Sequence, residues 1–445
     1  MFRLALILFG GDTLLKRWRV FLAAGLLTLL LGAVVLIDLG DGVADIASWV
    51  FGVILLLQGL VELVVGATHT GSRRRFEMLR GFVMVFIACL VLDFPWDNAI
   101  TAGVLFAVAF TLNGLIRIAF SLLVRPPAWR LSLAVAGVYW VMAVLLLTHW
   151  PLRDALNVSF CIGLGLLAVG FRLVRGAWRL KSLPPGSRLA AIELYRNRRP
   201  SDQKAASVAV PEWVVGHQEP MVVHIWLAVN KIPDRIRMPF FEHYIVAFSR
   251  KGGASAGHAS MECGSSLYIS HHPLVPLRVA QSDFKLRVRA TSDNDGPGFW
   301  SASYQDELRT GDPSTVRIRF RVFNRDYLHT FWSAYRQDAT YNLTHRNCSV
   351  AVVEAIDAGV EGVFADKPFW RTLLRLAFHP DMWLAGSVRV RADSIAWTPG
   401  LAMDYASALQ RITHPRRDLR LRLWRRWKKS RRRLRQAGAA LSPPL

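Results

Sequence analysis

Cysteine and acidic residues are scarce in this chain, and each scarcity removes a class of protein. Cysteine occurs 4 times in 445 residues, which is too few for a disulfide framework and fits a reducing compartment. Asp and Glu number 32 against 55 Lys and Arg, so the formal net charge is +23. Hydrophobic residues nevertheless make up 52% of the chain, which excludes a disordered basic protein. Apolar and charged residues must therefore occupy different parts of the chain.

The sequence also lacks a Walker loop and a dinucleotide-binding fingerprint. A glycine-rich stretch at 252–257 lies between expected strands and does not lead into a helix, as a phosphate-binding loop does. We interpret it as a turn that positions His258, and we expect no cofactor.

Long apolar runs are concentrated before about residue 180. A transmembrane helix needs about 20 apolar residues, and several such runs in succession are poorly explained as buried helices of a soluble domain. The third run is short unless it extends back through Phe76 to Leu79. Met1–Gly10 is too short and too poorly flanked for a signal peptide. The six expected spans are Val20–Ile37, Ile46–Val65, Gly81–Leu92, Ile100–Leu123, Leu131–Leu147 and Ala155–Val174.

The spans repeat at an interval of 55 residues. Asp38, Asp93 and Thr148 follow matching apolar pairs, and Leu-Gln-Gly-Leu-Val-Glu at 57–62 returns as Leu-Asn-Gly-Leu-Ile-Arg at 112–117. A fixed period indicates one repeated unit, here a transmembrane helical hairpin used three times. Over roughly residues 15–180 this pattern resembles the HdeD-like acid-resistance membrane protein family. The resemblance implies that residues 1–182 form an all-α six-helix transmembrane bundle of three helical hairpin repeats.

Basic residues mark alternate loops between these spans. They precede the first span, separate the second from the third and the fourth from the fifth, and follow the sixth, whereas Asp dominates the other loops. The positive-inside rule therefore predicts a multi-pass protein of the inner (cytoplasmic) membrane with both termini in the cytoplasm. Glu62, Arg117 and Arg172 lie near span ends at the same interval. They are relay or ligand groups or, as we favour, side chains that reach the interface or pair between repeats.

The sequence changes in character after the last span. Leu183-Pro-Pro-Gly-Ser187 breaks the helical pattern, and polar residues to about Pro220 indicate a linker over 183–220. Short β-like runs then precede helices, an order that predicts an α+β domain over 221–412. The expected strands are 222–229, 243–248, 258–263, 267–270, 286–290 and 316–322, and the expected helices are 326–335, 349–358, 368–378 and 401–412.

Cys348 is the first candidate for chemistry. It directly precedes the apolar run 350–356, so it is expected at a helix N-terminus, with Gly359 as the C-cap. The positive end of a helix dipole favours the thiolate, and His345 and Arg346 add positive charge nearby. A thiolate beside an imidazole is an activated nucleophile. The alternative is a small buried cysteine with a structural role.

Three segments, in this order, resemble a permuted papain-like (NlpC-like) cysteine hydrolase domain. They are Gly257-His-Ala-Ser260, Tyr268-Ile-Ser-His-His-Pro273 and the helix start that ends in Asn347-Cys-Ser349. The resemblance implies that Cys348 is the nucleophile and His258 the general base. It also implies a polar group that orients His258, for which Ser270 and His271 are the candidates. His271-His272 stand where relatives often have an aromatic pair. The resemblance therefore does not decide whether Ser270 or His271 orients His258.

Asn347 is a candidate for oxyanion stabilisation or for the helix cap. A zinc site is the alternative for the histidine cluster formed by His258, Cys263, His271 and His272. That cluster lacks the paired spacing of Cys-x-x-Cys or His-Glu-x-x-His motifs. We therefore expect no metal.

The C-terminal segment is strongly basic. Residues 416–435 contain 12 Lys or Arg and one acid, with Leu and Trp interleaved. In a chain already anchored by spans, we expect the tail over 413–445 to lie on the anionic cytoplasmic leaflet. A solvated tail is the second alternative and nucleic acid the least favoured. Membrane lipids are thus the expected partners, and the sequence leaves homo-oligomerisation open.

Two functions fit these observations. We favour a membrane-anchored cysteine hydrolase that cleaves an amide, isopeptide or thioester bond in a peptide, amide or acyl substrate. The alternative is a non-enzymatic, stress-related membrane scaffold whose soluble domain binds a partner and whose Cys348 is structural.

The orientation can be tested with reporters fused to the C-terminus. A phosphatase that is active only outside the cytoplasm should be inactive there, because the basic loops hold the C-terminus in the cytoplasm. A reporter that fluoresces only in the cytoplasm should be bright. The opposite pair of signals would overturn the orientation.

Overall fold

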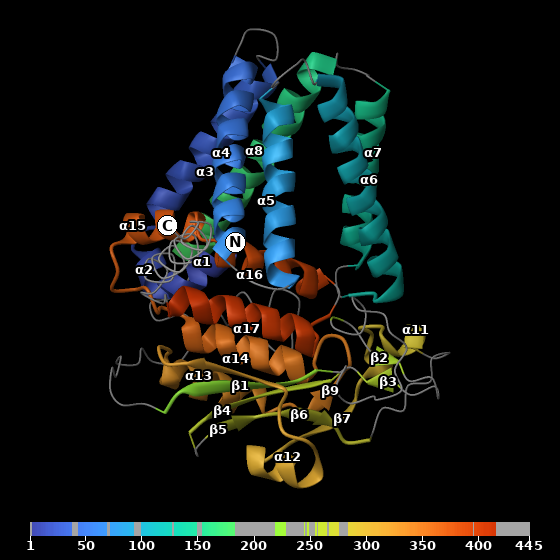
Figure 1. Cartoon of the computed structure of the whole chain (residues 1–445), viewed down its shortest axis with the longest axis vertical. Helices are drawn as coiled ribbons and strands as arrows, with labels where there is room; N and C mark the ends of the chain where they lie inside the picture. Colours follow the sequence, from blue (N-terminus) through green and yellow to red (C-terminus); the bar gives the residue numbers. More distant parts are fainter. Residues whose placement is uncertain are drawn as a thin grey trace, which may run out of the picture.

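The computed structural model shows a helical region stacked on a region of sheets and helices (Figure 1). The described residues are 2–37, 43–68, 72–92, 99–126, 129–148, 154–182, 219–227, 244, 247–248, 254–255, 257–264, 267–275, 284–394 and 396–414. Most of the expected linker (183–220) and basic tail (413–445) lies outside these residues.

The first region is helical throughout its described residues. Four of its helices have a stretch long and apolar enough to cross a membrane, at 18–37, 103–123, 129–147 and 160–181, which indicates a membrane protein. The helix at the expected third span begins at Ser72, before Phe76, but its apolar part, Met78–Val91, is shorter than a membrane span requires. The helices are α1 (Phe2–Phe9), α2 (Gly11–Leu15), α3 (Trp18–Ile37), α4 (Val43–Thr68), α5 (Ser72–Val91), α6 (Ala99–Leu123), α7 (Trp129–Leu147) and α8 (Asp154–Lys181).

Glycines allow these helices to pack closely. A Cβ added at Gly25 or Gly170 would lie 2.8 or 2.7 Å from a backbone nitrogen of the facing helix, so α3 and α8 meet backbone to backbone. Gly59 and Gly81 act in the same way between α4 and α5, at 2.8 Å each. The closest pairs are α3 with α8, α4 with α5, and α6 with α7. Each close pair therefore joins helices of different 55-residue units, rather than the two helices of one unit.

Charged side chains in this region also link helices. Glu62 on α4, which is buried, forms an ion pair with Arg80 on α5, with 3.2 Å between Oε2 and Nε. Arg117 on α6 lies over the ring of Tyr139 on α7, 5.5 Å from its centroid. Arg172 is exposed. For Glu62 and Arg117, these contacts match the expected pairing between repeats.

The second region is built on a four-stranded antiparallel sheet in the order β5-β4-β1-β8. Side chains alternate between its faces: Met221, Val223 and Ile225 of β1 join the main hydrophobic core, whereas Trp226 packs with Tyr268 and Tyr304 on the opposite side. The strands are β1 (Met221–Trp226), β4 (His258–Cys263), β5 (Leu267–Ile269) and β8 (Val316–Phe320).

Helices cover both faces of this sheet (Figure 1). α14 (Cys348–Val360), which is buried along its whole length, and α17 (Pro399–Thr413) lie on the core side, and α12 (Tyr304–Thr310) lies on the other. A smaller sheet has the order β6-β7-β9. The remaining elements are β2 (Ala247–Phe248), β3 (Ala254–Ser255), β6 (His271–Pro273), β7 (Gly296–Trp300), β9 (Thr340–Tyr341), α11 (Phe284–Arg287), η4 (Ser292–Asn294), α13 (Arg325–Tyr335), α15 (Phe369–Ala377) and α16 (Pro380–Ser394).

The N-terminal helix α1 belongs to the core of this second region. Ile7 and Leu8 are fully buried there. The backbone N–H groups of Gly362 and Phe364 donate to the carbonyls of Ile7 and Leu8, at 3.0 and 2.9 Å. The chain therefore begins inside the domain that its C-terminal half completes.

Two expectations about this region were wrong. Residues 286–290 are not a strand: α11 occupies 284–287, and the side chain of Asn294 donates to the carbonyls of Leu286 and Arg289 at 2.7 and 2.9 Å. Local capping by a side chain thus overrides the apolar alternation. Gly359 is not a C-cap, because α14 continues through it to Val360. An added Cβ at Gly359 would lie 3.2 Å from the sulfur of Met221, so this glycine allows α14 to lie close to β1.

We expect Leu8→Ala to destabilise the second region by about 2–5 kcal/mol, because it leaves a cavity in a fully buried site. Thermal unfolding of the detergent-solubilised protein should show a lower melting temperature. Leu274→Ala is the control, since Leu274 is 58% exposed and its truncation should cost less than about 0.5 kcal/mol. Equal melting temperatures for the two variants would contradict a core position for α1.

Candidate active site

Cys348 is the first residue of α14, and the preceding Asn347 caps the helix. The Asn347 side-chain oxygen accepts a hydrogen bond from the Val350 N–H at 2.9 Å. Its amide nitrogen donates to the carbonyls of Leu343 and Trp397, at 2.7 and 2.9 Å. Of the two expected roles, Asn347 thus has that of the cap, and its amide donors point at carbonyls of the protein.

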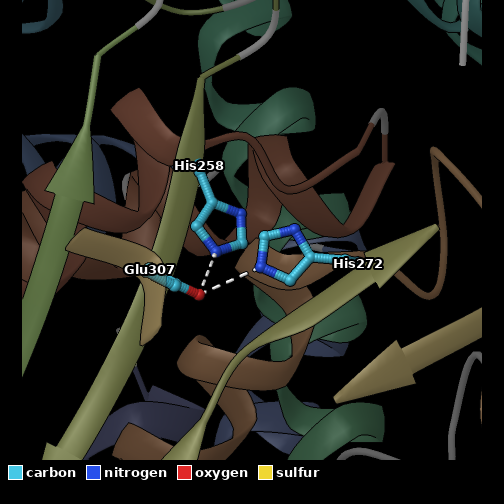
Figure 2. A group of neighbouring side chains, drawn as sticks. All are labelled: His258, His272 and Glu307. Carbon is cyan, nitrogen blue, oxygen red and sulfur yellow. Dashed lines mark hydrogen bonds and ion pairs between the residues drawn. The ribbon is translucent and has the colours of Figure 1, made fainter. Parts of the chain in front are cut away.

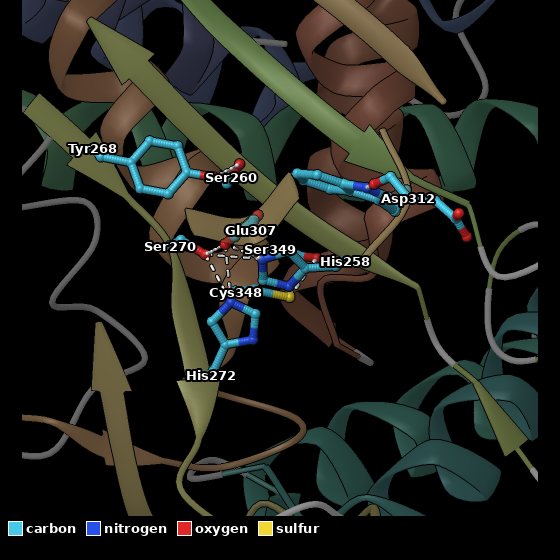
Figure 3. A network of polar contacts seen from close by, with 10 residues as sticks. His258, Ser260, Tyr268, Ser270, His272, Glu307, Asp312, Cys348 and Ser349 are labelled. Atoms are coloured by element: carbon cyan, nitrogen blue, oxygen red, sulfur yellow. Dashed lines mark hydrogen bonds and ion pairs between the residues drawn. The ribbon is translucent and has the colours of Figure 1, made fainter. Parts of the chain in front are cut away.

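His258 is the first residue of β4 and lies at the same end of the domain as the start of α14. Gly257, with φ of +79°, makes the turn into the strand, as expected from the glycine-rich stretch. The sulfur of Cys348 lies beside the imidazole of His258 (Figure 3), close enough for each group to shift the pKa of the other. The nucleophile and base candidates are therefore in contact (Figure 3).

The hydroxyl of Ser270 has three partners behind His258. Its Oγ lies 2.9 Å from His258 Nε2, 3.0 Å from His272 Nε2 and 2.5 Å from Glu307 Oε1. A hydroxyl donates one hydrogen and can accept two. It therefore donates to the carboxylate and accepts from the two Nε2–H groups. This arrangement selects the Nε2–H form of His258 and leaves Nδ1 for the sulfur, as Figure 3 shows.

Charges in this cluster stabilise one another. Burial acts to lower the pKa of His258, but the Cys348 thiolate and the Glu307 carboxylate outweigh it and raise this pKa to about 9. Burial acts to raise the pKa of Cys348, yet the charge and hydrogen bond of His258 hold it below its usual value. Despite burial, the hydrogen bonds from His258 and His272 keep the pKa of Glu307 low. These shifts favour a thiolate–imidazolium pair over the neutral pair, with an ionised Glu307 behind it.

His271, the other expected orienting residue, points away from His258. Successive side chains of an extended strand alternate, so Ser270 and His272 face the site and His271 faces the opposite side. The His271 ring lies against Trp300 and Tyr341, with centroid separations of 4.1 and 5.0 Å. Burial lowers its pKa to about 3, which keeps it neutral. Of the two candidates, Ser270 is the one that contacts His258.

Two residues of the cluster were not expected from the sequence: Glu307 and, as part of this network, His272. Ser303 caps α12 by accepting from the Asp306 N–H at 3.1 Å. The Ser-x-x-Asp spacing could have predicted this short helix. No local pattern indicates that its Glu307 reaches the His258 ring across the sheet, because that contact is tertiary.

His258, His272 and Glu307 could also supply metal ligands, since their ligand atoms lie within 4.8 Å of one another (Figure 2). His272 stacks on His258, with centroids 4.2 Å apart, and its Nε2 lies 3.0 Å from Glu307 Oε1. The Ser270 hydroxyl lies among these atoms and bonds to all three, so an ion would have to displace it. Of the zinc ligands considered from the sequence, Cys263 lies in the hydrophobic core and His271 points away. The geometry is that of a hydrogen-bond network.

Comparisons of this chain with protein-family models, with curated proteins and with solved structures found no match. The chemical interpretation of the site therefore depends on its geometry.

Alkylation of Cys348 by iodoacetamide across pH tests the ion pair. In the unchanged protein, fast alkylation should begin well below about pH 8.5, the pKa of a free thiol. Glu307→Gln removes a negative charge that holds the proton on His258, so the pKa of His258 falls and that of Cys348 rises. We expect at least a roughly tenfold slower reaction near pH 6, measured by mass spectrometry of the Cys348 peptide.

Glu262→Gln is the matched control. Glu262 lies on β4, the strand that carries His258, but it pairs with His224, at 3.0 Å. It should leave the pH profile of Cys348 unchanged. An ordinary thiol profile in the unchanged protein would rule out the ion pair.

Proposed function

We propose that this protein is a membrane-anchored cysteine hydrolase whose nucleophile is Cys348 and whose general acid–base is His258. The observation that carries the proposal is the contact between these two groups, with Ser270 and Glu307 behind the imidazole. A structural cysteine gains nothing from an ionised neighbourhood, because burying charges costs stability. Strongly perturbed groups gathered at one point are instead typical of active sites.

The chemistry would follow from the protonation states described above. The Cys348 thiolate attacks a carbonyl carbon, so a C–S bond forms and the C=O π electrons move to oxygen. The backbone N–H of Cys348, in the first turn of α14, has no carbonyl partner within the helix and is a suitable donor to this oxyanion. The His258 Nδ1–H then protonates the leaving nitrogen or sulfur, which departs and leaves an acyl-enzyme thioester.

Water would complete the cycle. His258, now neutral at Nδ1, takes a proton from water as the oxygen attacks the thioester carbon. The C–S bond breaks, the acid product leaves and the thiolate–imidazolium pair is restored. Through each change, Ser270 and Glu307 keep the ring orientation and favour the Nε2–H tautomer. These two are positioning residues, since they act through His258.

The order of the elements supports a permuted papain-like architecture for 221–412. The histidine strand β4 precedes the cysteine helix α14 in the chain, as in the domains that this sequence resembles. For the membrane region we propose an HdeD-like bundle of six spans, in which α4 and α5 join the four helices that meet the length and hydropathy requirement. Its basic loops support an inner membrane location with both termini in the cytoplasm.

A non-enzymatic scaffold is the second candidate, and one observation favours it. Cys348 and His258 are only 7% and 8% exposed, so the pair is nearly as enclosed as an ordinary core cysteine. In that case the soluble domain would bind a partner, and loss of the sulfur would have no effect beyond packing.

Turnover of fluorogenic amide and thioester substrates by the purified membrane protein distinguishes the two functions. For any substrate that is cleaved, Cys348→Ala should reduce kcat/KM by at least about 10³-fold, because the nucleophile is gone. Glu307→Gln should reduce it by roughly 10²- to 10⁴-fold through the His258 proton transfer. Glu262→Gln should retain full activity.

Unchanged melting temperatures would show that each variant is folded. Full turnover by folded Cys348→Ala would exclude the proposed nucleophile. Absence of turnover in the unchanged protein, together with an ordinary Cys348 alkylation profile, would favour the scaffold.

A further inference from the structure

Helix α15 has two apolar faces, and one of them has no protein cover among the described residues. Phe369, Thr372 and Leu376 are buried against the core of the second region. Trp370 and Leu374 are one helical turn apart and are 55% and 60% exposed. Phe378, one turn further on, is 51% exposed. Three large hydrophobic side chains therefore form an exposed stripe along this short helix.

The stripe lies at the level where the membrane helices end. The ring of Phe369 is 6.2 Å from that of Phe21, near the start of α3, and the guanidinium of Arg17 lies 4.6 Å over the Phe369 ring. Figure 1 shows α15 near α2, at the lower end of α3, where that helix begins, and well above the four-stranded sheet. A rigid helix at this level holds its exposed face where lipid headgroups meet acyl chains.

Aromatic and basic side chains mark the same level on the neighbouring helices. The ring of Trp18 lies between Arg19 and Lys181, with 5.6 and 5.0 Å from their charged groups to its centroid. Tryptophan and basic residues are typical of membrane–water interfaces. The contact between Phe369, on the buried face of α15, and Phe21 places α15 next to this belt.

Charge indicates which surface covers the stripe. Lys367, Arg371 and Arg375 are exposed beside it, against one exposed acid, Asp366, as on helices that lie in an anionic leaflet. The chain's own basic tail at 416–435 carries the same sign and would be repelled. A second copy would bring the same positive charges together.

We propose that α15 is an interfacial helix, which inserts Trp370, Leu374 and Phe378 into an anionic phospholipid leaflet while its opposite face packs on the soluble domain. The domain is then held against the bilayer at a second place besides the spans. This inference is independent of the proposed chemistry.

Depth-dependent quenching in nanodiscs that each hold one copy of the full chain tests the proposal. In a background where Cys89, Cys161, Cys263 and Cys348 are replaced by Ala, Leu374→Cys is labelled with an environment-sensitive fluorophore. Arg309→Cys on α12 is the matched control, since that side chain is 80% exposed at the far end of the molecule (Figure 1). The discs contain phosphatidylcholine and phosphatidylglycerol, with a nitroxide at a shallow acyl position.

The label at position 374 should be quenched at least about threefold more than the label at 309. Arg371→Gln with Arg375→Gln should reduce that difference, because the attraction to the anionic lipid is lost. Equal quenching at 374 and 309 would overturn the proposal. Blue-shifted emission at 374 without quenching would also overturn it, because protein and not lipid would then cover the stripe. Unchanged melting temperatures would show that these exposed substitutions leave the fold intact.

Discussion

The candidate site depends on one buried hydroxyl that satisfies three neighbours at once. Ser270, between β5 and β6, is fully buried and connects β4, α12 and β6 through His258, Glu307 and His272. Because it has one hydrogen to donate and two lone pairs, the carboxylate of Glu307 and the two Nε2–H groups use its capacity completely. Ionised groups in such a dry place are stable only when each has partners. Ser270 thus supports the charged pair indirectly, because it holds Glu307 and the two imidazoles in place.

A second buried network holds the helix that carries the sulfur. Asp357, near the far end of α14, bonds to Arg389 of α16 and to the Tyr405 hydroxyl of α17, and Arg389 also bonds to that hydroxyl, at 2.9 Å. With α1 packed beside α16 and the sheet on its other side (Figure 1), α14 is surrounded by protein along its length. A helix fixed in this way positions Cys348 with little freedom. Rigid support of this kind is what precise catalytic geometry requires.

The sequence predicted the parts of the molecule whose signals are local. Apolar runs located the membrane helices, short β-like runs located β1 and β4, alternation located β8, and the run after Cys348 located α14. The pairing of α3 with α8 could not be read in this way, because it depends on where glycines face each other in space. Glu307 and α1 were missed for a related reason: α12 and α1 are short, and their roles arise from contacts with distant segments. Ser270 was a correct candidate for contact with His258. Excluding His271 required knowing which face of the strand each side chain lies on, and the sequence alone does not give that.

The position of α1 has a consequence for how the protein is made. Ile7 and Gly362, which are hydrogen-bonded through their backbones, are 355 residues apart. The first helix leaves the ribosome early, yet its binding place forms only after all the membrane helices and the sheet have been synthesised. Domains usually fold in order during synthesis, and closing so long a loop is slow. The apolar α1 can therefore dock in its native place only late in synthesis, after the C-terminal half of this core has formed.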